Sequence, residues 1–179
     1  MNTVSNVETQ TTDAQTTNVG INTLLCRIEG GQLLLPDTLI AEVIEYQQAT
    51  IQMPSSPATQ DETDDEASER PLWYLGTLQW RQLSVPLVSL EALNSGGFFI
   101  HNHQLKIIIL NSIGEHAHMP YWGFISKDTP RMQRISADYL VADNTAELGN
   151  IEFMRAELLG EPVLLPDLEK IEALLIAAV

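Results

Sequence analysis

The chain has one cysteine and few basic residues, and each shortage excludes a class of protein. Among 179 residues, Lys and Arg together number 9 against 24 Asp and Glu, which gives a formal charge of −15. Nucleic-acid phosphates and anionic membrane surfaces both attract clustered basic side chains, so neither is an expected partner. The single cysteine, Cys26, cannot form an internal disulfide, and this fits a reducing compartment.

Signals for targeting and catalysis are also missing. The sequence shows no N-terminal apolar h-region and no uncharged stretch long enough to cross a bilayer, so we expect a cytoplasmic protein. Motifs for dinucleotide and phosphate binding, nucleophilic catalysis and zinc proteolysis are absent as well. The sequence therefore predicts a protein that is not an enzyme, with no catalytic residue, no metal site and no cofactor.

The apolar content is sufficient for a folded core, at 44% of the residues. Residues 1–20 are mainly polar and lack periodicity, so we expect a disordered N-terminal tail. Residues 22–178 are expected to form the folded domain. Within that domain, residues 52–70 are rich in Pro, Ser and acidic residues and exceed the length of an ordinary connection, which predicts a mobile acidic insertion.

Short apolar runs between turn residues predict a mainly β domain. Strands are expected at 24–28, 32–35, 106–110, 121–126, 154–159 and 163–165. Four consecutive aliphatic residues from Ile107 are typical of a strand with both faces covered. Short helices are expected at 89–94 and 167–175, capped by Ser89 and Asp167. Residues 85–90 and 163–168 are similar in sequence. Two similar halves of the domain would produce such a similarity, and so would chance.

The segment 37–48 has two interpretations. Leu39, Ile40, Val43 and Ile44 have helical spacing, and Asp37 is a suitable helix cap. Against a helix, the segment is short and three of these apolar residues are β-branched, which favours a strand. Periodicity alone leaves both interpretations open.

The most distinctive stretch runs from residue 71 to residue 90. It consists of two short apolar strands that meet at a polar turn carrying Arg81, and the second strand leads into the helix capped at Ser89. An arginine displayed at a turn of an apolar scaffold favours recognition, because its planar guanidinium can pair with a carboxylate or carbonyl of a partner. The alternative is an exposed turn residue that contributes only to solubility.

The order and spacing of this stretch resemble the central signature of CheW-type chemotaxis adaptors, P-x-x-x-x-G-x-x-x-x-R-G-x-x-x-P-x-x-D-L. The residues that match are Pro71, Gly76, Arg81, Pro86 and Leu90. Gln82 and Ser89 depart from the signature, because the family usually has Gly and Asp there.

The resemblance extends over about residues 22–178. The first strands are similar to those of the family through Leu24, Pro36, Ile40, Glu42 and Val43, and this favours the strand interpretation of 37–48. In an extended segment, Ile40 and Glu42 would share one face. Further along, Ser126 and Lys127 stand where the family usually has Val-Asp. Such departures indicate a divergent branch, like the ChpC-like and PilI-like adaptors of chemosensory systems that control type IV pili.

The resemblance implies a fold of two packed five-stranded SH3-like β-barrel subdomains with short helices. It implies a non-catalytic scaffold that couples the cytoplasmic tip of methyl-accepting chemoreceptors to a CheA-type histidine kinase, which binds through its own CheW-like domain. The implied partner-binding residues are Ile40, Glu42, Gly76 and Arg81. From the sequence alone, Glu42 could equally lie on the solvent side of an alternating strand.

The histidines suggest a rival function, because all four occur in two His-x-His pairs, His101/His103 and His116/His118. Alternate residues of a strand share a face, so each pair could offer two imidazoles to a metal. In the expected fold a strand lies between the pairs and would separate them by roughly 26 Å. Solvated loop histidines are therefore favoured, and the alternative is a small β-barrel metal-binding protein or enzyme.

Overall fold

The structure is a computed structural model that describes residues 20–46, 49–52, 71–96, 104–114 and 118–178. Apart from Gly20 and Gln52, the expected N-terminal tail and acidic insertion lie outside the described residues. Within the described part of the chain, no helix is both long enough and apolar enough to span a membrane.

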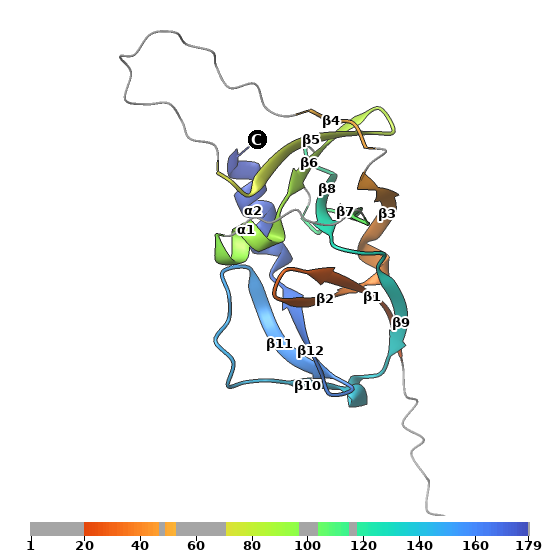
Figure 1. Ribbon diagram of the computed structural model, residues 1–179, viewed down its shortest axis with the longest axis vertical. Coiled ribbons are helices and arrows are strands. Elements are labelled where there is room, and N and C mark those ends of the chain that lie inside the picture. The colour runs from red at the N-terminus through yellow and green to blue at the C-terminus, as the bar shows by residue number, and fades with distance from the viewer. Residues whose placement is uncertain (1–19, 47–48, 53–70, 97–103, 115–117, 179) are drawn as a thin grey trace, which may run out of the picture.

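The strands form two sheets, which we name sheet A and sheet B (Figure 1). Sheet A contains β1 (Ile21–Ile28), β2 (Gly31–Pro36), β9 (Arg131–Ile135), β10 (Leu140–Ala142), β11 (Glu152–Leu158) and β12 (Glu161–Pro166). Sheet B contains β3 (Ile40–Glu45), β4 (Ile51–Gln52), β5 (Tyr74–Trp80), β6 (Leu83–Val88), β7 (Lys106–Asn111) and β8 (Tyr121–Ser126). Helices α1 (Leu90–Ser95) and α2 (Leu168–Ala178) follow β6 and β12, and the 3-10 turns η1 (Asp37–Leu39) and η3 (Ala137–Tyr139) precede β3 and β10.

The two sheets repeat one pattern of pairing. Sheet A has the strand order β10-β11-β12-β2-β1-β9, and sheet B has the order β4-β5-β6-β8-β7-β3. Each sheet has a parallel pair at its centre, β12 with β2 and β6 with β8, flanked by antiparallel pairs. In each parallel pair one strand leads into a helix: β12 leads into α2, and β6 leads into α1. The sequence similarity between 85–90 and 163–168 therefore coincides with a structural repeat.

A shared core fills the space between the two sheets. Sheet A contributes Leu24, Cys26, Leu33 and Leu35, sheet B contributes Ile108, Leu110, Trp122 and Phe124, and α2 contributes Ile171 and Leu175. Each sheet also covers a core of its own on its other face, and the sheet-B core contains Ile107 and Ile109. Because alternate residues of β7 enter different cores, the prediction of a strand with both faces covered is confirmed.

The prediction of a mainly β chain in two subdomains is confirmed, and so are the two capped helices. Each sheet counts six paired strands, compared with the five expected for each barrel. Of the segment 37–48, the structure describes 37–46, and these residues form η1 followed by the strand β3, as the resemblance favoured. The strands β4, β9 and β10 were not predicted from the sequence. All three are edge strands and carry few apolar residues that reach a core.

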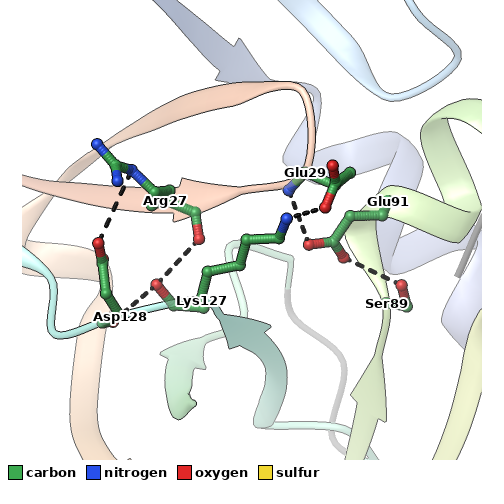
Figure 2. A network of polar contacts seen from close by, with 7 residues as sticks. Arg27, Glu29, Ser89, Glu91, Lys127 and Asp128 are labelled. Carbon is green, nitrogen blue, oxygen red and sulfur yellow. Dashed lines mark hydrogen bonds and ion pairs between the residues drawn. The ribbon is translucent and has the colours of Figure 1, made fainter. Parts of the chain in front are cut away.

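Polar contacts tie the β1–β2 turn of sheet A to sheet B (Figure 2). The backbone carbonyl of Arg27 accepts a hydrogen bond from the backbone N–H of Lys127 at 2.8 Å. The Lys127 ammonium pairs with Glu29. The backbone N–H of Glu29 donates to one carboxylate oxygen of Glu91 at 3.1 Å, and the Ser89 hydroxyl donates to the other at 3.0 Å. Burial raises the pKa of the Glu91 carboxyl, because the site disfavours its charged form.

A second polar junction joins α1 to β11 through Glu152, whose side chain is 1% exposed. Asn94 Nδ2 donates to Glu152 Oε1 at 2.7 Å. Arg155 donates from Nε to Oε2 at 2.6 Å and from Nη2 to Oε1 at 2.9 Å. These hydrogen bonds, those from Arg155 above all, lower the pKa of Glu152 from 4.5 to about 2.

We expect acid to weaken the fold through Glu152. Its pKa is lower in the folded chain, so its stabilisation is fully present above its unfolded pKa of 4.5 and is lost as the pH falls through about 2. The pKa difference corresponds to roughly 3 kcal/mol, which we reduce to about 2 kcal/mol because solvent screens the half-exposed Arg155. Urea titrations at a series of pH values measure this effect. As the pH falls, the unfolding free energy of the wild type should decrease by about 2 kcal/mol more than that of Glu152→Gln.

Glu161→Gln, which alters an exposed carboxylate on β12, is the matched control and should retain the acid sensitivity of the wild type. A Glu152→Gln variant with the same acid dependence as the wild type would contradict this account of Glu152.

Candidate partner-binding site

The site begins at the turn between β5 and β6, where Arg81 and Gln82 form a two-residue connection. Their φ angles are 48° and 66°, so both residues lie in the left-handed region. Two-residue hairpins favour this backbone because its twist matches that of the flanking strands, and glycine is the residue that adopts it most easily. Gln82 therefore carries backbone strain at the position where the CheW signature has Gly.

Arg81 projects from this turn and is held by two neighbours. Its Nη2 lies 2.8 Å from Glu42 Oε2 on β3, and its Cζ lies 4.6 Å from the centre of the Trp80 ring. The Trp80 indole Nε1 donates to the same Glu42 oxygen at 2.8 Å. Trp80 in turn packs against Tyr121 in a T-shaped arrangement, with ring centres 5.0 Å apart. We call Glu42, Trp80, Arg81 and Tyr121 the Arg81 cluster.

The ion pair at the centre of the Arg81 cluster is open to solvent. The side chains of Arg81 and Glu42 are 66% and 36% exposed. Exposed ion pairs contribute about 0–1 kcal/mol to stability, so folding alone gives little reason for this arrangement. A guanidinium has five N–H donors, and an exposed one that is already oriented can offer the others to a partner.

The structure thus brings together two of the four predicted partner-binding residues, Glu42 and Arg81. The other two lie elsewhere in sheet B. Gly76 is buried, with φ of 109°, at a bulge of β5 where the pairing with β6 shifts. Ile40 is half-buried and packs against the core between the sheets.

The expectation that Ile40 and Glu42 share a strand face is wrong. The register of β3 against β7 shifts between them, so that Ile40 pairs with Leu110 and Glu42 pairs with Ile109. Leu110 lies in the core between the sheets and Ile109 in the sheet-B core. This bulge directs Glu42 toward Trp80, and alternation in the sequence carries no signal for it.

Sequence reasoning also missed the roles of Trp80 and Tyr121. Trp80 is 7% exposed and belongs to the sheet-B core, so its apolar character alone predicts a packing role. Its position directly before Arg81 was the available signal, since a tryptophan beside an arginine offers a ring on which the guanidinium can stack.

The histidine hypothesis receives no support from the described residues. His101, His103 and His116 lie outside them, and His118 is exposed. No group of three or more His, Cys, Asp or Glu side chains in the described ranges could hold a metal ion. Cys26 is fully buried, and burial is the main cause that raises the pKa of its thiol to about 12, so it packs as an inert side chain.

The sequence matches no family model and no curated protein. The structure is similar to the crystal structure of the scaffolding protein TtCheW from Thermoanaerobacter tengcongensis, with a TM-score of 0.61 and 13% sequence identity. The alignment covers 83% of this chain and 89% of that chain. At this identity the likeness shows the fold, and the chain has a CheW-like architecture of two β subdomains.

We expect Gln82→Gly to stabilise the protein, because glycine adopts the left-handed backbone without the strain that a side chain adds. The greater freedom of glycine in the unfolded chain offsets part of this gain, so the net increase in unfolding free energy should be about 0.5–1 kcal/mol. Urea denaturation measures it.

Gln79→Gly is the matched control, because Gln79 lies within β5, where glycine should destabilise the strand. If Gln82→Gly lowers the stability as Gln79→Gly does, the account of strain in the turn is wrong.

Proposed function

We propose that this protein is a non-catalytic adaptor that couples chemoreceptors to a CheA-type histidine kinase. The Arg81 cluster is the observation that carries the proposal. Glu42 and Arg81, which the resemblance to CheW adaptors assigns to partner contact, lie far apart in the sequence and meet on an exposed surface. The CheW-like fold supports the same function.

Arg81 is suited to be the main contact of this surface. Ordering a long side chain normally opposes binding by about 0.5–1.5 kcal/mol, and Glu42 and the Trp80 ring reduce that cost by ordering the guanidinium beforehand. Arginine is also among the residues that dominate binding energies at interfaces. We infer that Arg81 donates to carboxylate or carbonyl oxygens of the chemoreceptor tip or of the kinase.

The other three predicted residues support the position of Arg81. Glu42 positions Arg81 through the ion pair between their side chains. Gly76 allows the bulge in β5, and Ile40 fixes the start of β3 against the core between the sheets. We therefore propose Ile40, Glu42, Gly76 and Arg81 as the partner-binding set, with direct contact by Arg81 and a supporting role for the others.

The proposed setting is a chemosensory pathway in the cytoplasm that controls type IV pilus motility. The kinase would bind through its own CheW-like domain, and the receptor through its cytoplasmic tip. Gln82, Ser126 and Lys127, which depart from the usual adaptor pattern, support a divergent branch of this kind.

We expect Arg81→Ala to weaken binding to the receptor tip or the kinase by at least about tenfold, which corresponds to about 1.4 kcal/mol. Its unfolding free energy should change by less than about 0.5 kcal/mol, because the side chain is exposed. Glu42→Gln keeps an acceptor for the Trp80 N–H but loses the charge that holds Arg81, so its affinity should be intermediate. Calorimetric titration with purified receptor fragments and kinase measures both variants.

Arg131→Ala is the matched control, because it removes an exposed arginine from β9 in the other sheet. Normal binding by both Arg81→Ala and Glu42→Gln would locate the contact surface elsewhere. Failure of the wild type to bind either partner would refute the adaptor function itself.

A further inference from the structure

Helix α2 has an apolar side chain on the face that points away from the core. Its inner face packs Leu168, Ile171 and Leu175 against the core between the sheets. On the outer face, Ala173 is exposed and Ile176 is 46% exposed. A surface helix usually carries polar residues there, and α2 does so at Glu169 and Lys170, so the apolar part of this face is confined to the C-terminal half of the helix.

The start of the connection after β7, residues 112–114, lies beside α2 and is fixed to it. Glu172, which is 2% exposed, accepts hydrogen bonds at Oε1 from the backbone N–H of Ile113 at 2.7 Å and from Trp122 Nε1 at 3.1 Å. Its Oε2 accepts from the backbone N–H of Gly114 at 3.1 Å. These bonds set the spacing between the connection and α2, so the surface between them is formed before any partner arrives.

A groove of about 500 Å³ lies between the two elements. It is lined by Ile113, Gly114, Glu169, Glu172, Ala173 and Ile176. Ile113 is 44% exposed on one side and Ile176 is 46% exposed on the other. The small side chain of Ala173 leaves room for an aliphatic side chain to enter between the two isoleucines.

Among the described residues that line the groove, the charged side chains are all acidic. Both of its charged lining residues, Glu169 and Glu172, are acidic, and the last turn of α2 contains no basic residue. The partial negative charge at the end of α2 therefore adds to that of the carboxylates. Lys170, the basic residue of α2, donates from Nζ to Asn150 Oδ1 at 3.0 Å and is absent from the lining.

We propose that this groove, the α2 groove, is a second docking surface whose occupant is an amphipathic helix of a partner protein. Aliphatic side chains of that helix enter between Ile113 and Ile176, and flanking Lys or Arg side chains face Glu169. Helix α2 and β3 lie well apart in Figure 1, and no member of the Arg81 cluster lines the groove. It goes beyond the proposed adaptor function, for which the Arg81 cluster is the supporting observation.

The test uses the full chain, labelled with ¹⁵N, and two synthetic helical peptides. Both peptides place Leu at the i, i+3, i+4 and i+7 positions of one face, and one carries Lys elsewhere where the other carries Glu. The Lys peptide should shift the amide signals of 113–114 and 169–176, and it should bind at least about tenfold more tightly than the Glu peptide, a difference of about 1.4 kcal/mol. Fluorescence anisotropy gives the affinities.

Ala173→Glu separates groove binding from general attraction to an acidic protein. It fills the groove while adding negative charge, so binding in the α2 groove should weaken at least about tenfold, whereas nonspecific attraction would strengthen. Ala142→Glu adds the same charge at an exposed alanine of β10 and should leave the affinity unchanged. Ile176→Ser should weaken binding without added charge, and unfolding midpoints near that of the wild type establish that the variants are folded.

Three results would overturn the proposal. The first is tighter or unchanged binding of the Lys peptide to Ala173→Glu, and the second is equal affinity for the Lys and Glu peptides. The third is a concentration-dependent dimer of the chain that Ala173→Glu abolishes in sedimentation experiments, since the occupant would then be a second copy of this chain.

Discussion

The burial of both faces of β7 is the constraint on which the rest of the structure depends. Ile107 and Ile109 pack into the sheet-B core, and Ile108 and Leu110 pack into the core between the sheets. Sheet B alone would leave Ile108 and Leu110 in water, so it requires β1 and β2 from the start of the chain and α2 from its end. The two subdomains have the same pattern of strand pairing, but they share a core, so neither is expected to fold without the other.

The geometry of the Arg81 cluster depends on the strand pairing of sheet B, which the burial of β7 stabilises. β7 pairs with β3 and thereby positions Glu42, while β8 pairs with β6 and supports the hairpin that ends at Arg81. Tyr121 at the start of β8 packs against Trp80. An exposed ion pair of little energetic value to the fold is therefore held by buried strands on several sides, as expected of a binding surface built on a rigid scaffold.

The elements that the sequence could predict are those with strong local signals. The aliphatic run of β7 requires two covered faces, and Ser89 caps α1 by accepting a hydrogen bond from the backbone N–H of Ala92 at 3.2 Å. The strand β3 within the segment 37–48 was predicted only with the resemblance to CheW adaptors. Two features could not be predicted from the sequence: the bulge that directs Glu42 toward Trp80, and the contact between Glu42 and Arg81. Both depend on strand register, which local periodicity does not encode.

The central claim is that the exposed arginine of this CheW-like fold serves a chemosensory signalling complex. Its most direct test is purification of the tagged chain from its native cells, with the associated proteins identified and quantified by mass spectrometry. The account predicts that a CheA-type histidine kinase and a methyl-accepting chemoreceptor co-purify with the wild-type chain and are depleted with Arg81→Ala. Absence of both proteins from the wild-type sample would contradict it.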